Sequence, residues 1–375
     1  MFDVLPHALE RLRAQQPVSI ATVVKADGSS PRDPGAAMVV GADGAVFGSV
    51  SGGCVEGAVY EIATEVLETG VPVLEVFGYS DADAFAVGLT CGGELTVHIQ
   101  RVDPQDADLV ARIVADVEGG KPVAWVTVIA HPDPAHLGRK VIVRPDSHEG
   151  TLGSEFADHA VPSDVRGVLA AGDSRIMHFG PGGERMGNEM EVFVASFQPK
   201  PRMLIFGAVD FAAALAQQAS ILGFDVTVCD ARSIFATPER FPAADRVIVD
   251  WPHRYVSAQV EAGLIDSRTV VCVLTHDAKF DVPVLVAVTA LPEEIRPHYI
   301  GVMGSRRTHD DRVKRMRDAG MTEPQLGLLD SPIGLDLRGR TPQETAVSIA
   351  AHIIARRWGG TGVPLSELHS DIHAR

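Results

Sequence analysis

Two cysteines of this chain stand in glycine turns, where a thiol has room to react. Cys54 follows Gly52 and Gly53 in the stretch SGGCVEG, and Cys91 precedes Gly92 in the stretch GLTCGGE. Glycine lets a ligand approach the backbone closely. A helix predicted to start just after Cys54 adds a dipole and exposed N–H groups that stabilise a thiolate. The pair could bind a soft metal, relay sulfur or act as acid and base; alternatively, both residues fill tight corners.

A fixed cation precedes the first of these turns. Arg32 lies between two prolines in the stretch SSPRDPG. The rigid backbone of such a turn suits this arginine to hold an anionic group near the same pocket. The alternative is an ordinary surface arginine in a loop.

A turn of the Rossmann type follows in the second half of the chain. In the stretch RMLIFGAVDFA, Gly207 supplies the tight turn, and Asp230 follows at about the 20-residue spacing of a ribose contact. Val209 stands where a second glycine would let the backbone approach a pyrophosphate. Asp230, with Arg232 two residues on, is a candidate contact for NAD(P). The alternative is a Rossmann-shaped domain used for another ligand or for packing.

Basic residues open a helix at the carboxyl edge of the same sheet. They follow the predicted strand YIGVM and comprise Gly304, Ser305, Arg306 and Arg307. The helix itself is predicted to begin at Thr308. Backbone N–H groups, a hydroxyl and two guanidinium groups at a helix start predict a site for a phosphate-bearing ligand. The alternative is a solvated, charged helix start.

A histidine and two carboxylates follow the preceding strand at that edge. The stretch LTHDAKFD contains His276, Asp277 and Asp281. A histidine beside carboxylates can serve as a general base or a metal ligand. The alternative is that the aspartates only cap a helix.

The hydrophobic pattern predicts an α/β protein of two domains and a tail. Residues 1–197 mix short strands with helices and predict an α+β domain that carries both cysteine turns. Within this domain, residues 122–197 predict strands separated by loops. The proline-containing stretch QPKPR marks the boundary. Residues 198–358 alternate continuous apolar strands with helices, which predicts a Rossmann-like, doubly wound parallel sheet. Its last helix is predicted to start at Thr341 as N-cap, with Pro342 in the first turn and Glu344 as capping partner. Residues 359–375 are predicted to be a flexible tail, and no internal repeat is evident.

Composition limits the partners of the protein. With 33 basic and 49 acidic residues the net charge is −16, which argues against nucleic acid or an anionic membrane as a partner. Neither a basic leader nor a membrane-length apolar run is present, so we expect a cytoplasmic protein. Cys229 and Cys272 lie in apolar runs and are expected to be inert core thiols. A homodimer is the commonest assembly for such a chain.

Several motifs, in one order, resemble the XdhC/CoxI family of accessory proteins for molybdenum hydroxylases such as xanthine dehydrogenase. They include GSSPRDPGAAMVV, GSVSGGCVEG, GLTCGGEL, LTHDAKFD and YIGVMGSRRT. The resemblance implies a protein that binds the molybdenum cofactor, favours its sulfurated form and delivers it to an apo-hydroxylase, with a cysteine desulfurase as a further partner. It implies Cys54 and Cys91 as ligands of the molybdenum centre, because thiolates suit soft metals. It also implies a pterin-phosphate contact at Arg32 or at residues 304–307.

One motif departs from the family. Where the family usually reads GAGHVA, this chain reads GAVDFA from Gly207 to Ala212. Two alternative functions stay open beside the chaperone, and Val209 in this motif counts against the first of them. One is a nicotinamide-dependent oxidoreductase, with Asp230 on the ribose and His276 as acid or base. The other is an isomerase that uses the cysteine pair.

Overall fold

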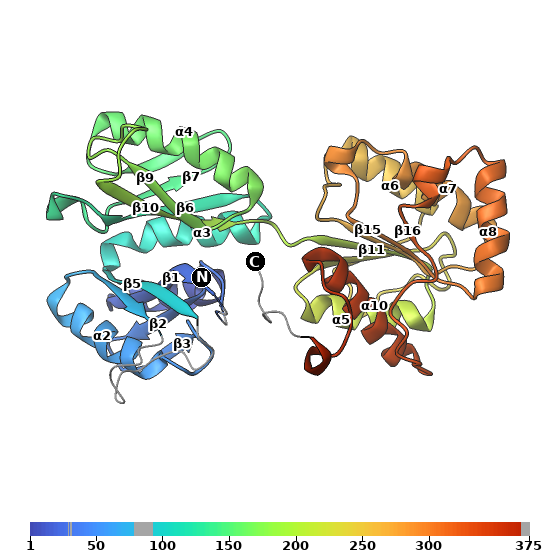
Figure 1. The fold of residues 1–375 in the computed structure, drawn as a ribbon, viewed down its shortest axis with the longest axis horizontal. Coiled ribbons are helices and arrows are strands. Elements are labelled where there is room, and N and C mark those ends of the chain that lie inside the picture. The colour runs from blue at the N-terminus through green and yellow to red at the C-terminus, as the bar shows by residue number, and fades with distance from the viewer. Residues whose placement is uncertain (29, 31, 79–92, 369–375) are drawn as a thin grey trace. The chain divides into compact units, whose positions relative to one another are not determined.

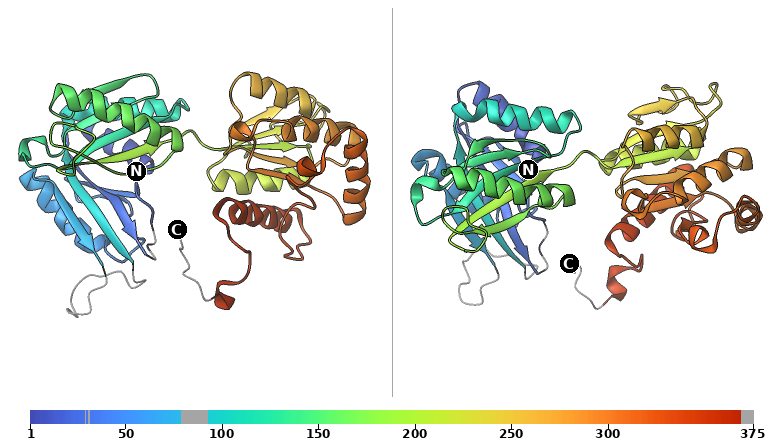
Figure 2. Two further views of the ribbon diagram at one scale, coloured as in Figure 1. Left: turned by 45° about the horizontal axis from the view of Figure 1, so that its top comes forward. Right: turned by 90° about the horizontal axis from the view of Figure 1, so that it is seen from above.

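The computed structural model describes residues 1–28, 30, 32–78 and 93–368, and the chain divides into two compact units (Figure 1, Figure 2). The first unit runs from Met1 to Pro199 and the second from Lys200 to Leu368. Antiparallel sheets with helices form the first unit, and a parallel sheet with helices forms the second. The predicted fold class, an α+β region followed by a Rossmann-like region, is confirmed.

A five-stranded antiparallel sheet opens the first unit. Its strands lie in the order β3-β2-β1-β5-β4. The elements of this half are α1 (Leu5–Arg13), β1 (Val18–Asp27), β2 (Ala37–Gly41), β3 (Val46–Gly48), α2 (Glu56–Thr69), β4 (Val73–Phe77) and β5 (Glu94–Val102). Helix α2 covers one face, because Val59, Ala63 and Val66 recur at helical spacing and join the core of the sheet. Gly70 ends the helix in the left-handed conformation, with φ of 71°.

A second five-stranded antiparallel sheet completes the first unit. Its strands lie in the order β8-β7-β6-β10-β9. The elements of this half are α3 (Ala107–Glu118), β6 (Val123–Ala130), β7 (Lys140–Val143), β8 (His148–Thr151), α4 (Glu155–Ala171), β9 (Arg175–Phe179) and β10 (Met190–Phe197). Helix α4 covers one face of this sheet through Val161, Val165 and Val168, the same spacing that α2 uses on the first sheet.

The two halves of the first unit repeat one connectivity. Each reads helix, three strands, helix, two strands, and the two strand orders correspond position by position. The expectation that the chain holds no internal repeat is therefore wrong at the level of topology. The sequence does not reveal the repeat because the halves share the spacing of apolar residues but not the residues themselves.

Helix α4 is also absent from the elements that the sequence predicts. The pattern from residue 122 to residue 197 predicts strands and loops, yet α4 is helical over 17 residues. Pro162 lies inside this helix and is buried. Because an interior proline removes a backbone hydrogen bond, it normally indicates a helix end. Packing of the valine stripe outweighs that penalty here.

The second unit is built on a six-stranded parallel sheet. Its strands lie in the order β13-β12-β11-β14-β15-β16, which is the Rossmann order with a switch point between β11 and β14. The strands are β11 (Arg202–Phe206), β12 (Asp225–Cys229), β13 (Arg246–Ile248), β14 (Val270–Val273), β15 (Tyr299–Val302) and β16 (Leu329–Asp330). The helices are α5 (Asp210–Ile221), α6 (Pro252–Glu261), α7 (Ala278–Thr289), α8 (Arg306–Asp318), α9 (Glu323–Leu326) and α10 (Pro342–Trp358).

Both faces of this sheet are buried under helices. On β11, Met203 and Ile205 join the core under α5 and α10, whereas Leu204 and Phe206 join the core under α6 and α7. Figure 1 shows the two helix layers on opposite sides of the strands. Because both faces are covered, the strands read as continuous apolar runs. Among the described residues, no helix is long and apolar enough to cross a membrane.

Candidate functional site

One edge of the first sheet collects three connections of the chain. The strand ends at this edge are identified by the register: Asp27 pairs with Glu94, Leu95 with Phe77, and Met38 with Gly48. Because neighbouring strands are antiparallel, β1, β3 and β4 end at this edge, while β2 and β5 begin there.

The predicted residues of the first unit belong to these connections. Arg32 is exposed in the β1–β2 connection, and Cys54 is exposed in the β3–α2 connection. Cys91 and Gly92 lie outside the described residues; the link that contains them joins β4 to β5, whose ends are at the same edge. The topology thus brings Arg32, Cys54 and both ends of the third link to one edge of the sheet.

Glu56 organises the loop that holds Cys54. Its carboxylate accepts hydrogen bonds from the hydroxyls of Ser49 and Ser51, each at 2.6 Å. It also accepts from the backbone N–H groups of Ser51 at 2.9 Å, Gly52 at 2.9 Å and Gly53 at 2.8 Å. Burial alone would raise the pKa of this carboxyl, but the hydroxyl and amide donors outweigh it and lower the pKa of Glu56 to about 2.

The same network changes the expected setting of Cys54. The Oγ of Ser51 accepts from the N–H of Cys54 at 3.0 Å and from the N–H of Val55 at 3.1 Å. The exposed N–H groups that were expected to stabilise a Cys54 thiolate are therefore engaged by Ser51 and Glu56, and that part of the prediction is wrong. The thiol itself is exposed. Glu56 adds a negative charge to the loop, and the amides of Gly52, Gly53 and Cys54 are hydrogen-bonded to Glu56 and Ser51.

The two glycines before Cys54 keep the loop open. Gly52 has φ of 83° and Gly53 has φ of 126°, values that side chains rarely tolerate. A Cβ added at either position would meet no atom within 4 Å. The glycines therefore serve the backbone conformation, and no atom of the described residues crowds the positions where their side chains would begin.

The other described cysteines are core residues, as predicted. Cys229 is 1% exposed and Cys272 is fully buried. Burial raises the pKa of the Cys229 thiol to about 12 and raises the pKa of the Cys272 thiol as well. Among residues 1–28, 30, 32–78 and 93–368, no group of three or more His, Cys, Asp or Glu is placed to hold a metal ion. Of the described thiols, Cys54 alone is accessible.

The carboxylate of Asp230, which was expected to contact a ribose, already accepts hydrogen bonds from other groups of the protein. The side chain is buried, and its carboxylate accepts from the N–H of Ala208 at 2.8 Å. Arg232 donates to it through Nε at 2.9 Å and through a terminal nitrogen at 2.7 Å. Gly207, with φ of 114°, approaches Thr275 so closely that a Cβ would lie 2.9 Å from the Thr275 nitrogen. Through these contacts, the segments that follow β11, β12 and β14 pack against one another beside the switch point.

The polar residues after β14 have two different roles: Asp277 caps α7, whereas His276 and Asp281 line a pocket. Asp277 caps α7: it accepts from the N–H of Lys279 at 3.1 Å and pairs with the Lys279 ammonium, which lowers the pKa of Asp277. Asp281 is 1% exposed and accepts from Nε of Arg312 at 3.1 Å. Burial raises the pKa of Asp281 to about 6 against the opposite effect of Arg312. His276 is exposed and lines a pocket beside this pair.

The residues predicted at the start of the basic helix also have different roles. Helix α8 begins at Arg306, two residues earlier than predicted, and the Ser305 hydroxyl accepts from the N–H of Thr308 at 3.2 Å as its cap. Of the predicted group, Arg307 lines the pocket. The sequence prediction missed Arg312 and Arg315, which also line it. The available signal was the helical spacing of Thr308, Arg312 and Arg315, which places them on one face.

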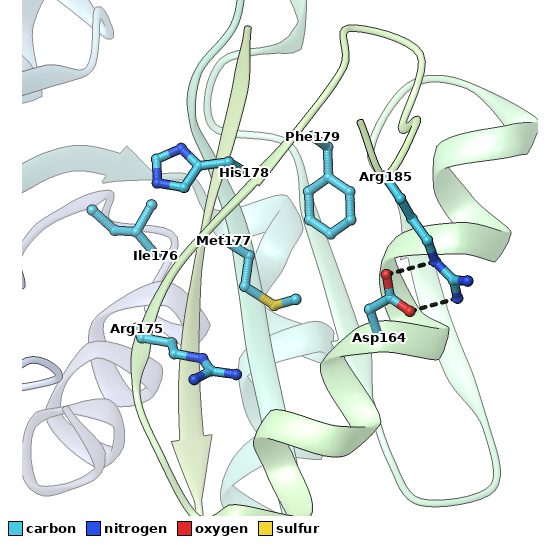
Figure 3. A pocket seen from close by; sticks show the side chains of 7 residues that line it. All are labelled: Asp164, Arg175, Ile176, Met177, His178, Phe179 and Arg185. Atoms are coloured by element: carbon cyan, nitrogen blue, oxygen red, sulfur yellow. Dashed lines mark hydrogen bonds and ion pairs between the residues drawn. The ribbon is translucent and has the colours of Figure 1, made fainter. Parts of the chain in front are cut away.

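A second pocket lies on the other half of the first unit (Figure 3). It has a volume of about 420 Å³. Its lining comes from α4, β9 and the link after β9: Asp164, Arg175, Ile176, Met177, His178, Phe179 and Arg185. Arg185 donates to Asp164 at 3.0 and 2.6 Å across its rim. In the repeated connectivity, this link corresponds to the one that holds Cys91, but no predicted site residue lines the pocket.

The fold and these sites define a two-unit α/β protein with an exposed thiol loop on a duplicated antiparallel unit and a basic pocket on a Rossmann unit. The chain belongs to the XdhC and CoxI family. The model for that family matches residues 11–78 and 117–180, one stretch in each half of the first unit. The model described as the XdhC Rossmann domain matches residues 203–353.

Named relatives match nearly the whole chain. A protein of Bacillus subtilis (strain 168), named as a probable subunit of xanthine dehydrogenase, is 27% identical over 92% of this chain and 95% of its own. The molybdenum cofactor insertion chaperone PaoD of Escherichia coli (strain K12) is 26% identical over 94% of this chain and 88% of its own. A crystal structure from Bacillus halodurans, described as that of a xanthine dehydrogenase, is 26% identical with a TM-score of 0.69, and the alignment covers 96% of this chain and 98% of that one.

Proposed function

We propose that this protein is a chaperone that binds the molybdenum cofactor and inserts it into an apo-hydroxylase of the xanthine dehydrogenase type. The cofactor is its cargo, and the sulfurated form is the preferred one. The observation that carries the proposal is the exposed Cys54 thiol in an open loop. The name of the relative PaoD supports the molybdenum cofactor as the cargo, and the name of the Bacillus subtilis relative supports xanthine dehydrogenase as the class of client enzyme.

The loop chemistry fits a transient ligand of a soft metal centre. Thiolate is a soft donor that suits molybdenum–sulfur centres. Because Glu56 and Ser51 bind the loop amides, Cys54 is held in a fixed backbone without being enclosed by it. A chaperone has to release its cargo, so an exposed ligand on a rigid loop serves it better than a closed cage. Arg32 and Cys91 complete the proposed site from the neighbouring connections.

The cargo's phosphate gives Arg32 its role in this proposal. Arg32 is exposed in a connection that leaves the same edge as the Cys54 loop. A guanidinium can bind a phosphate through paired hydrogen bonds. A thiol for the metal end and an arginine for the phosphate end would orient the cofactor along this edge. The cysteine desulfurase and the homodimer remain predictions.

Retention of the cofactor tests the proposal. The purified protein is incubated with free molybdenum cofactor, unbound cofactor is removed, and bound molybdenum and oxidised pterin fluorescence are measured. We expect near-stoichiometric retention by the wild type and a loss of about tenfold or more in Cys54→Ser and Cys91→Ser, because each removes a metal–sulfur bond. Cys229→Ala, which removes a buried thiol, should retain the cofactor.

The same samples are then added to apo-xanthine dehydrogenase to measure its activation. Wild-type protein loaded with cofactor should activate the enzyme, and the Cys54→Ser sample should not. Full retention by both serine variants would remove the thiols from the site. An absence of retention by the wild type would reject the chaperone function itself.

A further inference from the structure

We propose that the pocket between α7 and α8 of the second unit binds a phosphate group, held by Arg307, Arg312 and Arg315. The pocket is lined by His276, Ala278, Asp281, Arg307, Thr308, Asp311, Arg312 and Arg315. The inference goes beyond the proposed function, because it concerns the Rossmann unit and can be tested with inorganic phosphate, without the molybdenum cofactor.

Arg312 is the centre of the argument. It is 5% exposed, and it donates through one terminal nitrogen to Asp281 at 3.0 Å and to the carbonyl of Met303 at 2.9 Å. Its other terminal nitrogen, Nη1, is buried and has no hydrogen-bond partner among the described residues. A buried charged donor without a partner is costly. An anion in the pocket that Arg312 lines would be a further acceptor for this guanidinium group.

The charges around Arg312 favour an anion. Arg307 and Arg315 line the same pocket from about one turn before and one turn after it on α8. Asp281 is already engaged by Arg312 and by the Thr275 hydroxyl. Three guanidinium groups therefore line the pocket, and Asp311 is the acidic residue that remains to oppose them within the described lining. Guanidinium groups bind phosphate oxygens through paired hydrogen bonds.

The position and the size of the pocket define the ligand further. It is lined by residues from the first turns of α8 and from the start of α7, after β14 and β15, and the dipole of a helix favours a negative charge near its N-terminus. Its volume is about 200 Å³. Pockets for drug-sized ligands usually span about 300–1,000 Å³. The pocket therefore suits a phosphate group rather than a whole dinucleotide or pterin.

Titration of the full-length protein with inorganic phosphate tests the site. Binding is measured by isothermal titration calorimetry at low salt for the wild type, Arg307→Ala, Arg315→Ala and Arg306→Ala. Arg306 is the matched control, because it lies beside Arg307 at the helix start but does not line the pocket. We expect each lining variant to weaken phosphate binding about tenfold or more and the control to change it by less than about twofold.

Two further arms complete the test. Arg312→Lys keeps the positive charge, so we expect it to fold and to leave the circular dichroism spectrum unchanged. Because it loses the planar guanidinium group, it should bind phosphate more weakly than the wild type. Glycerol phosphate replaces inorganic phosphate in a parallel titration: tighter binding of the ester assigns the site to a larger ligand's phosphate, and tighter binding of the free ion assigns it to phosphate itself. Equal weakening by Arg306→Ala would overturn the inference. So would an absence of binding by the wild type at about 10 mM phosphate, a concentration that would fill about nine-tenths of a site with a Kd of about 1 mM.

Discussion

At the scale of single residues, Glu56 decides what the Cys54 loop can do. A first-turn acid on a helix usually serves the dipole of its own helix. Here the carboxylate turns back to the loop and binds two serine hydroxyls and three backbone amides. Loop rigidity therefore depends on an ionised Glu56, and the exposed thiol depends on loop rigidity.

The substitution Glu56→Gln tests that dependence. The pKa of Glu56 is about 2 in the folded protein and 4.5 ordinarily. Because the folded pKa is the lower one, the carboxylate stabilises the fold above pH 4.5, and this stabilisation is lost as the pH falls toward 2. We expect Glu56→Gln to lower the free energy of unfolding at pH 7 by about 1–2 kcal/mol, allowing for solvent screening of a partly exposed group.

Urea unfolding from pH 7 to pH 3 measures the effect. The difference between wild type and Glu56→Gln should be constant down to about pH 4.5 and should narrow below it. Glu61→Gln, an exposed position on the same helix, should differ from the wild type by less than about 0.5 kcal/mol at every pH. A difference that does not depend on pH would mean that the charge of Glu56 is not what holds the loop.

The sequence predicted the position of the Cys54 loop but not its hydrogen bonds. The glycines and the following helix were readable, because each carries a local conformational preference. The closure by Glu56 was not, because a serine hydroxyl and a loop amide give no sequence pattern of their own. Arg312 was missed for a related reason: its partner Asp281 is on α7, and pairing between elements is set by packing.

At the scale of elements, Gly207 fixes how the first turn of the Rossmann unit meets β14. Its φ of 114° and its approach to Thr275 both exclude a side chain. Nucleotide-binding turns also need a glycine with positive φ, but the group closest to Gly207 in this protein is Thr275 rather than a pyrophosphate. The turn therefore has a structural role, because it packs directly against the segment that follows β14.

Gly207→Ala should destabilise the second unit strongly. The added Cβ would lie 2.7 Å from Cγ2 of Thr275 and 2.9 Å from its backbone nitrogen. Backbone strain and overpacking together predict a loss of about 3 kcal/mol or more in the free energy of unfolding. Gly223→Ala is the matched control, since Gly223 has φ of 80° but no atom within 4 Å of a Cβ. It should cost about 1–2 kcal/mol, the backbone penalty alone; equal losses in the two variants would show that close approach is irrelevant.

Helix ends show where sequence prediction of elements succeeds. For α10 the sequence predicts Thr341 as N-cap, Pro342 in the first turn and Glu344 as its capping partner, and the structure confirms all three. Such signals are local and need no tertiary contact. For α4 the local signal is misleading: Pro162 indicates a helix end, but the helix continues through it because burial of the valine stripe outweighs the cost of the proline.

At the scale of the whole molecule, the candidate sites are divided between two units with separate cores. Cores of the first unit include Ile20, Trp125 and Val161, and cores of the second include Ile205 and Val271. The Cys54 loop belongs to the duplicated unit and the Arg312 pocket to the Rossmann unit. Within the first unit the topology is doubled, but the accessible thiol among the described residues occurs in one half only.

Separate cores predict that each unit folds and keeps its own site when the chain is cut between Pro199 and Lys200. Each fragment should unfold in one cooperative transition. The fragment 200–375 should bind phosphate within about twofold of the full-length affinity, because all three arginines come from α8. The fragment 1–199 lacks the pocket and should bind inorganic phosphate at least about tenfold more weakly than the full chain. Its Cys54 should react with a thiol reagent as fast as in the full chain. A second fragment that folds but loses phosphate would mean that the first unit completes the anion site, and an unfolded fragment would mean that the separate cores do not suffice.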